Sequence, residues 1–432
     1  MKYFIATILI SAVVISCARQ SSITEYQLSN GLKVIIIPFK KGELISMVTL
    51  YSIGETSDPL EKSGMAHLIE HLYVTSAAGA FPSRDINRFM ADYPKGWNAQ
   101  TGMDYTVIAT VFPKRQLDAE LRMAAARMKS IDITENDLDR EIPRIEKELI
   151  NMYDRIPMLA SQNLSAEMLL GSQLKERKGG VSEQIRTITV DELRARASTF
   201  YKPVNAQIIV CGPVEPGKIR KRIDKLFSNI QTGEPVPAKT VTPLPGHKKL
   251  QIKDITPSFP NAQSCVALSY RAPSPADRLH PAYLVLVHRL QVNSQALEFS
   301  PNTLLVFYAA LDRPEVISLV LPVENQENPE AALDRLEKYV DEIRIRKIDN
   351  EEIIASRRNF NFIFCRETYP NSVLAGDSYG VAFAIGRKKQ LGINGDTLMQ
   401  QIDAVTQEEL SAAGEYFALE KSAAAIIKIR KY

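Results

Sequence analysis

A proline-rich stretch near the middle of the chain limits how its 432 residues can fold. Six prolines lie between Gln231 and Pro260, a density that disfavours helix and central strand. The stretch therefore predicts a semi-rigid linker over 231–260. It divides the chain after residue 16 into parts of about 210 and 170 residues, each of domain size. We predict two domains, at 17–230 and 261–432.

Both halves mix strand patterns with helical patterns. Asn30-Gly31 is a hairpin turn signal between the first two strands. Further strand patterns lie at 32–38, 45–53, 106–112, 206–211, 264–270, 304–309, 316–322 and 423–429. Helical patterns lie at 63–75, 83–91, 116–129, 134–154, 189–200, 217–226, 281–292, 329–343, 350–360 and 407–417. The order predicts an α+β fold of two related domains, each with an antiparallel-rich sheet.

The first residues have the composition of an export signal. Lys2 precedes an uncharged apolar run that is shorter than the ~20 residues of a membrane-spanning helix. The run ends in Ser16-Cys17 and resembles the lipobox of bacterial lipoproteins, in which the Cys is lipidated after cleavage. We expect residues 1–16 to be a lipoprotein signal peptide and Cys17 to carry the lipid; a plain secretory signal is the alternative. The protein would then be a lipid-anchored membrane protein of the cell envelope that faces the periplasm, and Ala18 favours the outer membrane.

Charge and cysteine content exclude two classes of protein. Lys and Arg number 53 against 50 Asp and Glu, so the net charge is only +3 and no nucleic-acid partner is expected. Four cysteines in a chain of this length cannot form a disulfide framework. Cys211, Cys265 and Cys365 lie in apolar runs, and we expect buried thiols, with one disulfide as the alternative.

The candidate metal-binding residues lie in the helical pattern that begins at residue 63. His67 and His71 are one turn apart on the same helical face, which suits two ligands of one Zn²⁺. Glu70 borders this face and can reach a water that the zinc activates. The pattern is the inverted zincin motif H-x-x-E-H, for which a chance match is the alternative. Catalytic zinc needs a third protein ligand, which must come from elsewhere in the chain.

Three glutamates on the pattern at 134–154 are candidates for the third ligand. Glu141 and Glu148 are seven apart, so they share a face on a regular helix, whereas Glu146 points elsewhere. Pro143 lies between them and is expected to kink or restart the helix. The alternative is that all three are solvated helix charges.

These residues resemble the pitrilysin/insulinase family of zinc peptidases, which includes the mitochondrial processing peptidase. In that family a glutamate ligand follows the motif at the spacing of Glu148, which lies 77 residues after His71. A second glutamate, seven residues earlier and matched by Glu141, assists the site. The resemblance implies one Zn²⁺ per chain, held by His67, His71 and Glu148. It also implies that Glu70 takes a proton from water and delivers it to the leaving amine.

Further segments extend the resemblance over most of the chain. The stretch from Trp97 to Thr106 resembles the family pattern N-A-x-T-x-x-D-x-T, and 28–34 resembles its opening hairpin. The resemblance implies that Asn98 and Ala99 lie on an edge strand to which a peptide substrate adds. It also implies a half clamshell in which helices pack on one side of each sheet.

One family feature is missing. Active members supply an Arg and a Tyr from the second half, in a pattern like L-R-x-x-x-G-x-x-Y. The corresponding stretch, 293–308, contains no Arg and no Gly, and only Tyr308 remains as a candidate. Because short members form two-chain clamshells, we expect a heterodimer with a related zinc-less chain, with a homodimer as the alternative.

The expected function is a zinc endopeptidase that cleaves peptides or unfolded segments in the cell envelope. The alternative is a non-catalytic scaffold or binding subunit of the same fold.

Overall fold

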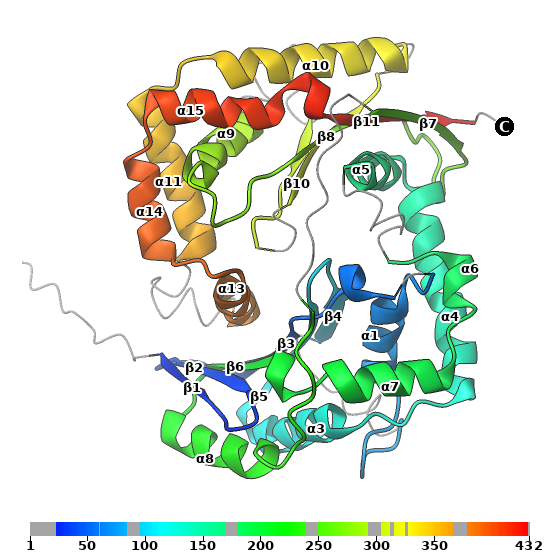
Figure 1. The fold of residues 1–432 in the computed structure, drawn as a ribbon, viewed down its shortest axis with the longest axis vertical. Coiled ribbons are helices and arrows are strands. Elements are labelled where there is room, and N and C mark those ends of the chain that lie inside the picture. Colours follow the sequence, from blue (N-terminus) through cyan, green and yellow to red (C-terminus); the bar gives the residue numbers. More distant parts are fainter. Residues whose placement is uncertain are drawn as a thin grey trace, which may run out of the picture.

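Two β-sheets, one from each half of the chain, organise the computed structural model (Figure 1). The structure describes residues 23–59, 61–83, 96–169, 179–237, 249–292, 304–311, 315–324, 327–365 and 378–430. The predicted architecture of two sheet-plus-helix halves is confirmed. The expected signal peptide at 1–16, Cys17 and most of the helix expected at 83–91 lie outside the described residues.

The first sheet has the strand order β1-β2-β6-β3-β5-β4. Its strands are β1 (Thr24–Gln27), β2 (Lys33–Pro38), β3 (Leu44–Tyr51), β4 (Trp97–Thr101), β5 (Thr106–Pro113) and β6 (Ala206–Gly212). All neighbours are antiparallel except β2 and β6. The β1–β2 hairpin turns at Gly31, whose φ of 91° is a conformation that glycine adopts readily. Every residue of β6 is buried, as expected for a strand that is covered on both faces.

The second sheet has the order β7-β11-β8-β10-β9. Its strands are β7 (Lys249–Ile255), β8 (Cys265–Arg271), β9 (Leu305–Phe307), β10 (Val316–Pro322) and β11 (Ala423–Ile429). Strand β7 lies within the segment expected to be a linker and pairs in parallel with β11. It occupies the proline-free interval of that segment and, among the described residues, pairs with one strand, so the flanking prolines do not interrupt the sheet.

Helices cover both sheets. In the first half they are α1 (Met65–Thr75), α3 (Leu117–Lys129), α4 (Glu135–Ile150), α5 (Pro157–Glu167), α6 (Ser182–Ile185), α7 (Val190–Phe200) and α8 (Pro216–Phe227). In the second half they are α9 (His280–Val292), α10 (Pro329–Ile345), α11 (Asn350–Phe364), α13 (Ser378–Leu391), α14 (Gly395–Asp403) and α15 (Gln407–Gly414). Thr134 and Thr189 begin α4 and α7 with capping boxes, which explains where both helices start.

One helix from each half packs on the sheet of the other half. Helix α5 packs on β8, β10 and β11 of the second sheet, and α13 packs on β3 and β6 of the first (Figure 1). Val381, Ala382 and Ile385 of α13 form a buried cluster with Val48 and Ile209 of the first sheet. Each sheet therefore has its own helices on one face and a helix from the other half on the opposite face. Long-range packing of this kind leaves no local sequence pattern.

A buried arginine anchors α13 to the first half. Arg387 is fully buried, and its Nη2 donates to Oδ1 of Asp104 at 3.0 Å. Its Nε donates to the carbonyl of Leu311, and the guanidinium lies 4.3 Å from the centre of the Tyr105 ring. Gln390 donates to the Asp104 carbonyl as well. The turn between β4 and β5 is thereby tied to the second half of the chain.

We expect Arg387→Met to lower the free energy of unfolding by about 2–3 kcal/mol, because it leaves Asp104 and the Leu311 carbonyl unpaired. The value is below that of a fully buried ion pair because the Asp104 side chain is 32% exposed. Urea unfolding followed by circular dichroism measures the change. Lys389→Met is the matched control. Lys389 lies two residues after Arg387 on the same helix, and its one ion pair with the described residues is an exposed pair with Glu25 of β1. Equal losses in the two variants would contradict the anchor.

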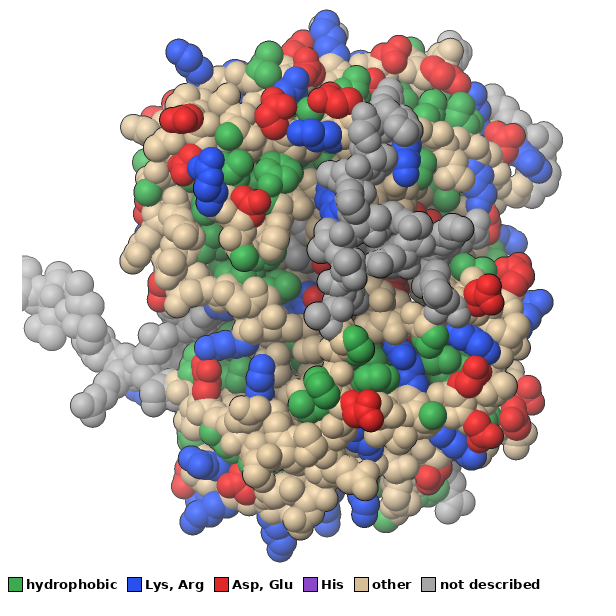
Figure 2. All heavy atoms as spheres, in the orientation of Figure 1, with side chains coloured by type: hydrophobic (Ala, Val, Ile, Leu, Met, Phe, Trp, Pro, Cys, Tyr) green, Lys and Arg blue, Asp and Glu red, His purple; other side chains and the backbone are tan. Residues whose placement is uncertain are grey.

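The expectation of buried thiols is tested by the described residues. Cys211, Cys265 and Cys365 are buried thiols, and burial raises the pKa of Cys265 to about 12. Across the described part of the chain, no helix is both long and apolar enough to cross a membrane. Figure 2 shows Lys and Arg side chains interspersed with Asp and Glu over both halves, in keeping with the small net charge.

Candidate metal centre

Three predicted ligands meet between α1 and α4. Nε2 of His67 lies 3.4 Å from Oε2 of Glu148, and Nε2 of His71 lies 3.8 Å from the same oxygen. One ligand atom from each of the three side chains lies within 4.8 Å of the others. The two imidazole rings are nearly perpendicular, with centroids 4.9 Å apart. The structure thus brings together the residues expected to bind metal.

The donor set and its spacing fit Zn²⁺. Two imidazoles and one carboxylate are a common set of protein ligands for catalytic zinc. Ligands placed about 2.0–2.2 Å from a tetrahedral ion are about 3.4 Å from one another, close to the two nitrogen–oxygen distances here. The site therefore needs only small side-chain movements to hold the ion.

The other nitrogen of each imidazole is held by a hydrogen-bond acceptor. His67 donates from Nδ1 to the carbonyl of Gly179 at 2.9 Å, and His71 donates from Nδ1 to Oε2 of Glu141 at 3.3 Å. A carbonyl and a carboxylate can only accept, so Nδ1 carries the proton in both rings. When the ring is neutral, this leaves the lone pair on Nε2, the nitrogen that faces Glu148 and the candidate ion position, as zinc requires.

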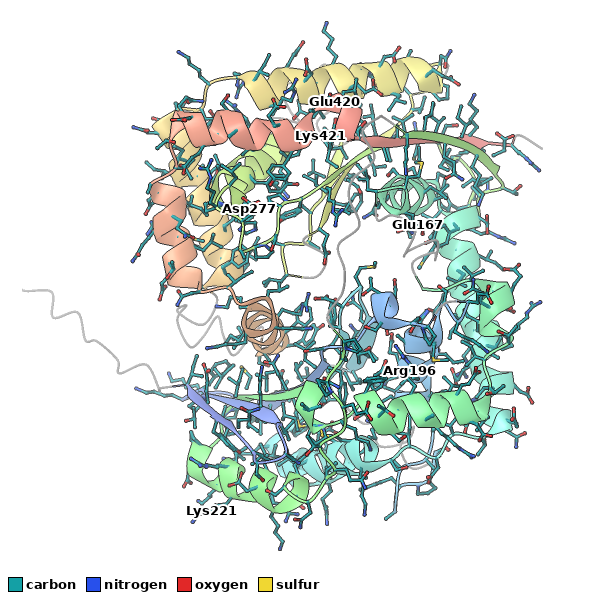
Figure 3. The ribbon with its side chains drawn as sticks, viewed as in Figure 1. Glu167, Arg196, Lys221, Asp277, Glu420 and Lys421 are labelled. Atoms are coloured by element: carbon teal, nitrogen blue, oxygen red, sulfur yellow. The ribbon has the colours of Figure 1, made fainter. Side chains whose placement is uncertain are left out.

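Helix α1 is fixed at its first turn, which sets the positions of both histidines. Its N-cap is Gly64, with φ 95°, and Asp58 accepts hydrogen bonds from the backbone N–H groups of Gly64 and Ala66 at 3.0 Å. Asp58 thus caps the helix from six residues before its N-cap. Arg196 of α7, labelled in Figure 3, donates to the Ser57 carbonyl and lies 3.7 Å from Asp58.

The glycine pair Gly179-Gly180 packs against the start of α1 and holds His67 in place. Gly180 has φ 114°, and a Cβ atom there would lie 2.6 Å from Cα of Gly64, so only glycine allows this approach. The neighbouring N–H of Gly179 donates to Oε1 of Glu55, in the short 3-10 turn Glu55–Ser57, at 3.0 Å. Sequence reasoning missed this support, although the doublet Gly179-Gly180 was a visible signal.

Glu141 is almost completely buried behind His71. Burial alone would raise its pKa, but hydrogen bonds from His71, Arg140 and Arg144 lower the pKa to about 2. Glu141 is therefore ionised and anchors His71 as an acceptor. The two arginines were not predicted, although they stand one residue before and three residues after Glu141.

Among the three ligand side chains, each histidine interacts with the oppositely charged carboxylate of Glu148. Burial lowers the pKa of His71, but hydrogen bonds with Glu141 and Glu148 outweigh it and raise the pKa to about 9. Hydrogen bonds from His67 and His71 hold the pKa of Glu148 well below its usual range. Zinc must therefore displace protons from the histidines when it binds.

Glu70 lies beside the ligands on α1 and is buried. Its negative charge raises the pKa of both His67 and His71. Its side-chain carboxylate has no hydrogen-bond partner among the described residues. Its oxygens are therefore available to a water or a substrate.

Helix α4 separates the three candidate glutamates. It runs without interruption through Pro143, so the helix does not restart there, whereas the expected kink stays a prediction. Glu141 and Glu148 lie two turns apart on one face. Glu146 accepts hydrogen bonds from Ser182 at 2.7 Å and Arg186 at 2.6 Å, which ties α4 to α6. As predicted, Glu146 points away from the metal ligands.

The residues expected to contact a substrate lie outside the cluster of three metal ligands. Asn98 and Ala99 lie on β4, the last strand of the first sheet, which packs beside α1. Their part in peptide binding stays a prediction. Tyr308 packs edge-on against Tyr283 in the second half, with ring centroids 5.8 Å apart. The rest of the stretch that replaces the family's Arg and Tyr pattern, 293–303, lies outside the described residues.

We expect Glu141→Gln to weaken zinc binding about 10–100-fold. The glutamine amide can still accept the hydrogen bond from His71, but it lacks the negative charge of the carboxylate. Competition with a chromogenic chelator measures the affinity. Glu146→Gln is the control on the same helix, and it should bind zinc as the unaltered chain does. Unchanged affinity in Glu141→Gln would show that His71 needs no anionic support.

Comparisons with known proteins agree with this geometry. Residues 40–178 match the family described as Insulinase (Peptidase family M16), and residues 187–360 match the Peptidase M16 inactive domain. The zinc protease PqqE of Helicobacter pylori is 24% identical over 244 residues, which make up 54% of this chain and 54% of that protein. The chain thus spans about half the length of this curated relative.

Solved structures share the fold. A protease from Helicobacter pylori has a TM-score of 0.80 at 18% identity, covering 94% of this chain and 99% of that one. The periplasmic protease PqqL from Escherichia coli has a TM-score of 0.69 at 18% identity, over 94% of this chain and 47% of that one. A peptidase M16 inactive domain from Pseudomonas fluorescens has a TM-score of 0.74 at 15% identity, over 95% and 98%.

Proposed function

Because the chain belongs to the pitrilysin/insulinase family of M16 peptidases, we propose that it is a zinc-dependent endopeptidase acting on peptides or unfolded segments. The observation that carries the proposal is the convergence of His67, His71 and Glu148, with ligand atoms within 4.8 Å, beside the buried Glu70. Four groups at these positions have no evident structural use. One ion per chain is proposed because the described residues contain one such cluster.

The residues of the chain have separate roles in this reaction. Bound zinc supplies a Lewis acid that polarises the scissile carbonyl and makes a water more acidic. Glu70 takes a proton from the attacking water and delivers it to the leaving amine. Glu141 holds His71 through Nδ1, and the Gly179 carbonyl holds His67 in the same way. These contacts keep the two ligands oriented throughout the reaction.

The substrate is proposed to bind as an added strand on β4. The strand is at the end of its sheet, and Asn98 is exposed there. Strand addition reads the peptide backbone, so it favours extended or unfolded segments and tolerates many sequences. The packing of β4 beside α1 supports this site, because it brings a bound peptide toward the metal ligands.

We also propose a location and a partner. Cys17 carries a lipid, and the protein works at the periplasmic side of the cell envelope; the similarity to a periplasmic protease supports this location. A related zinc-less chain supplies the substrate-binding Arg and Tyr that 293–308 does not offer, and a homodimer is the alternative assembly.

A non-catalytic subunit is the second candidate. It is favoured by the match of 187–360 to an inactive domain and by the similarity to a solved inactive domain. A scaffold does not require the complete set of zinc ligands and Glu70.

Hydrolysis of a quenched mixed-peptide library separates these proposals. The zinc-loaded chain is assayed alone and with a related chain that lacks H-x-x-E-H. Cleavage by the chain alone supports the peptidase and excludes an obligatory partner, whereas cleavage only by the mixture supports the heterodimer. No cleavage in either sample, with zinc bound, would overturn the peptidase in favour of the scaffold.

A further inference from the structure

Helix α8 carries a basic face that the proposed reaction does not use. Its twelve residues include five Lys or Arg and one Asp, a net charge of +4, whereas the whole chain has only +3. The rest of the chain is therefore close to neutral. Figure 2 shows Lys and Arg side chains along the lower margin of the molecule, where α8 lies in Figure 1.

The lysines of α8 are directed outward as a stripe. Lys218, Lys221 and Lys225 are exposed and follow one another at the spacing of a single helical face. Figure 3 labels Lys221 at this margin, where it points away from the ribbon. The apolar side chains Ile219 and Ile223 are buried on the opposite face. The helix is thus amphipathic, with a charged outer side.

Acidic groups near α8 pair with three of its five basic residues and leave two lysines without an acidic partner among the described residues. Asp118 of α3 pairs with Arg222, and Asp224 lies 3.9 Å from Arg220, so these acids neutralise arginines at the side of the helix. Glu215 pairs with Lys218 at 2.7 Å, but both side chains are exposed, so the pair is weak. Lys221 and Lys225 form no ion pair with the described residues.

The basic face is fixed beside the start of the described chain. Arg220 of α8 lies 4.7 Å from the ring centre of Tyr26 on β1. Asn30, in the β1–β2 turn, donates from Nδ2 to the carbonyls of Phe227 and Ile230 at 2.8 and 3.0 Å. These contacts lock the helix against the hairpin that follows the first described residues.

The proposed lipid site is only a short distance along the chain from this hairpin. The described chain begins at Ile23, six residues after Cys17. Six residues span at most about 20 Å even when fully extended. A lipid on Cys17 therefore holds β1, and α8 beside it, near the membrane surface.

We propose that the basic face of α8, formed by Lys218, Lys221 and Lys225, docks on an anionic phospholipid surface. The proposal rests on the envelope location and the lipid at Cys17, and it is independent of the peptidase chemistry. The acyl chains would supply most of the affinity, so the basic face sets the orientation of the protein on the bilayer. A lipid chain combined with a polybasic patch is a common pair of membrane signals.

Vesicle binding by a chain that begins at residue 18 tests the face without the lipid. Such a chain keeps every described element. Co-sedimentation is measured with phosphatidylcholine vesicles, with and without phosphatidylglycerol. Each basic residue at an anionic surface contributes about fivefold to partitioning, so Lys221→Glu with Lys225→Glu should weaken binding by at least about 25-fold. Raising the salt from about 0.1 M to about 1 M should abolish binding.

A matched control reverses two exposed lysines of the second half, Lys338→Glu with Lys347→Glu, and should bind phosphatidylglycerol vesicles as the unaltered chain does. Equal losses in the two double variants, full binding by the α8 variant or no binding by the unaltered chain would overturn the proposal. The last result would leave an acidic protein as the partner of this face. Zinc content and peptide hydrolysis, measured on the same samples, report separately on the proposed function.

Discussion

Glu70→Gln is expected to lower peptide hydrolysis about 10²–10⁴-fold while the protein keeps its zinc. Glutamine has the shape of glutamate but cannot accept a proton from water. The Glu70 side chain has no hydrogen bond to the other described residues, so the substitution breaks no side-chain hydrogen bond that holds α1. The metal ligands His67, His71 and Glu148 are unchanged. Initial rates on a quenched peptide library and metal analysis of the same sample measure the two effects.

Two outcomes would contradict this role of Glu70. Full hydrolysis by Glu70→Gln would show that another group takes the proton. Loss of zinc together with activity would instead make Glu70 a ligand. Glu146→Gln, a change of the same chemistry on α4, is the control and should keep both zinc and activity.

His71→Ala is expected to abolish zinc binding at micromolar metal, and hydrolysis with it. The substitution removes one of three ligand atoms and leaves Glu141 buried without its histidine partner. A site with two protein ligands holds zinc too weakly to retain it during purification. Metal analysis after gel filtration checks the result.

The control for His71→Ala is His288→Ala in the second half. His288 bonds Ser356 at 3.0 Å and has no part in the metal cluster, so this variant should keep one zinc per chain. One zinc per chain in His71→Ala would refute the assignment of His71 as a ligand.

The sequence predicted the centre of the site well because that part is local. Two histidines one helical turn apart share a face wherever the helix lies, so His67 and His71 are identifiable from the motif alone. Glu148 was one of three candidate glutamates on its own helix, and the family resemblance singled it out. The structure separates them by contacts that no spacing encodes, since Glu146 accepts hydrogen bonds from Ser182 of α6 and from Arg186, which directly follows α6.

The parts that could not be predicted depend on residues far apart in the chain. Arg387 meets Asp104 across 283 positions, and His67 meets Gly179 across 112. Periodicity describes one element at a time, so it cannot indicate that α5 and α13 exchange between the halves. Pro143 shows the opposite error, because a local rule predicted a break in a helix that stays continuous.

The central claim is that one zinc ion, held by the His67–His71–Glu148 cluster, supports peptide hydrolysis. Its most direct test is a zinc titration of the protein isolated with its partners and stripped by a chelator. The account predicts that hydrolysis of the peptide library is absent after stripping and rises linearly to a plateau at one ion per chain. Hydrolysis that persists in the stripped protein, or that stays absent at one bound ion per chain, would contradict it.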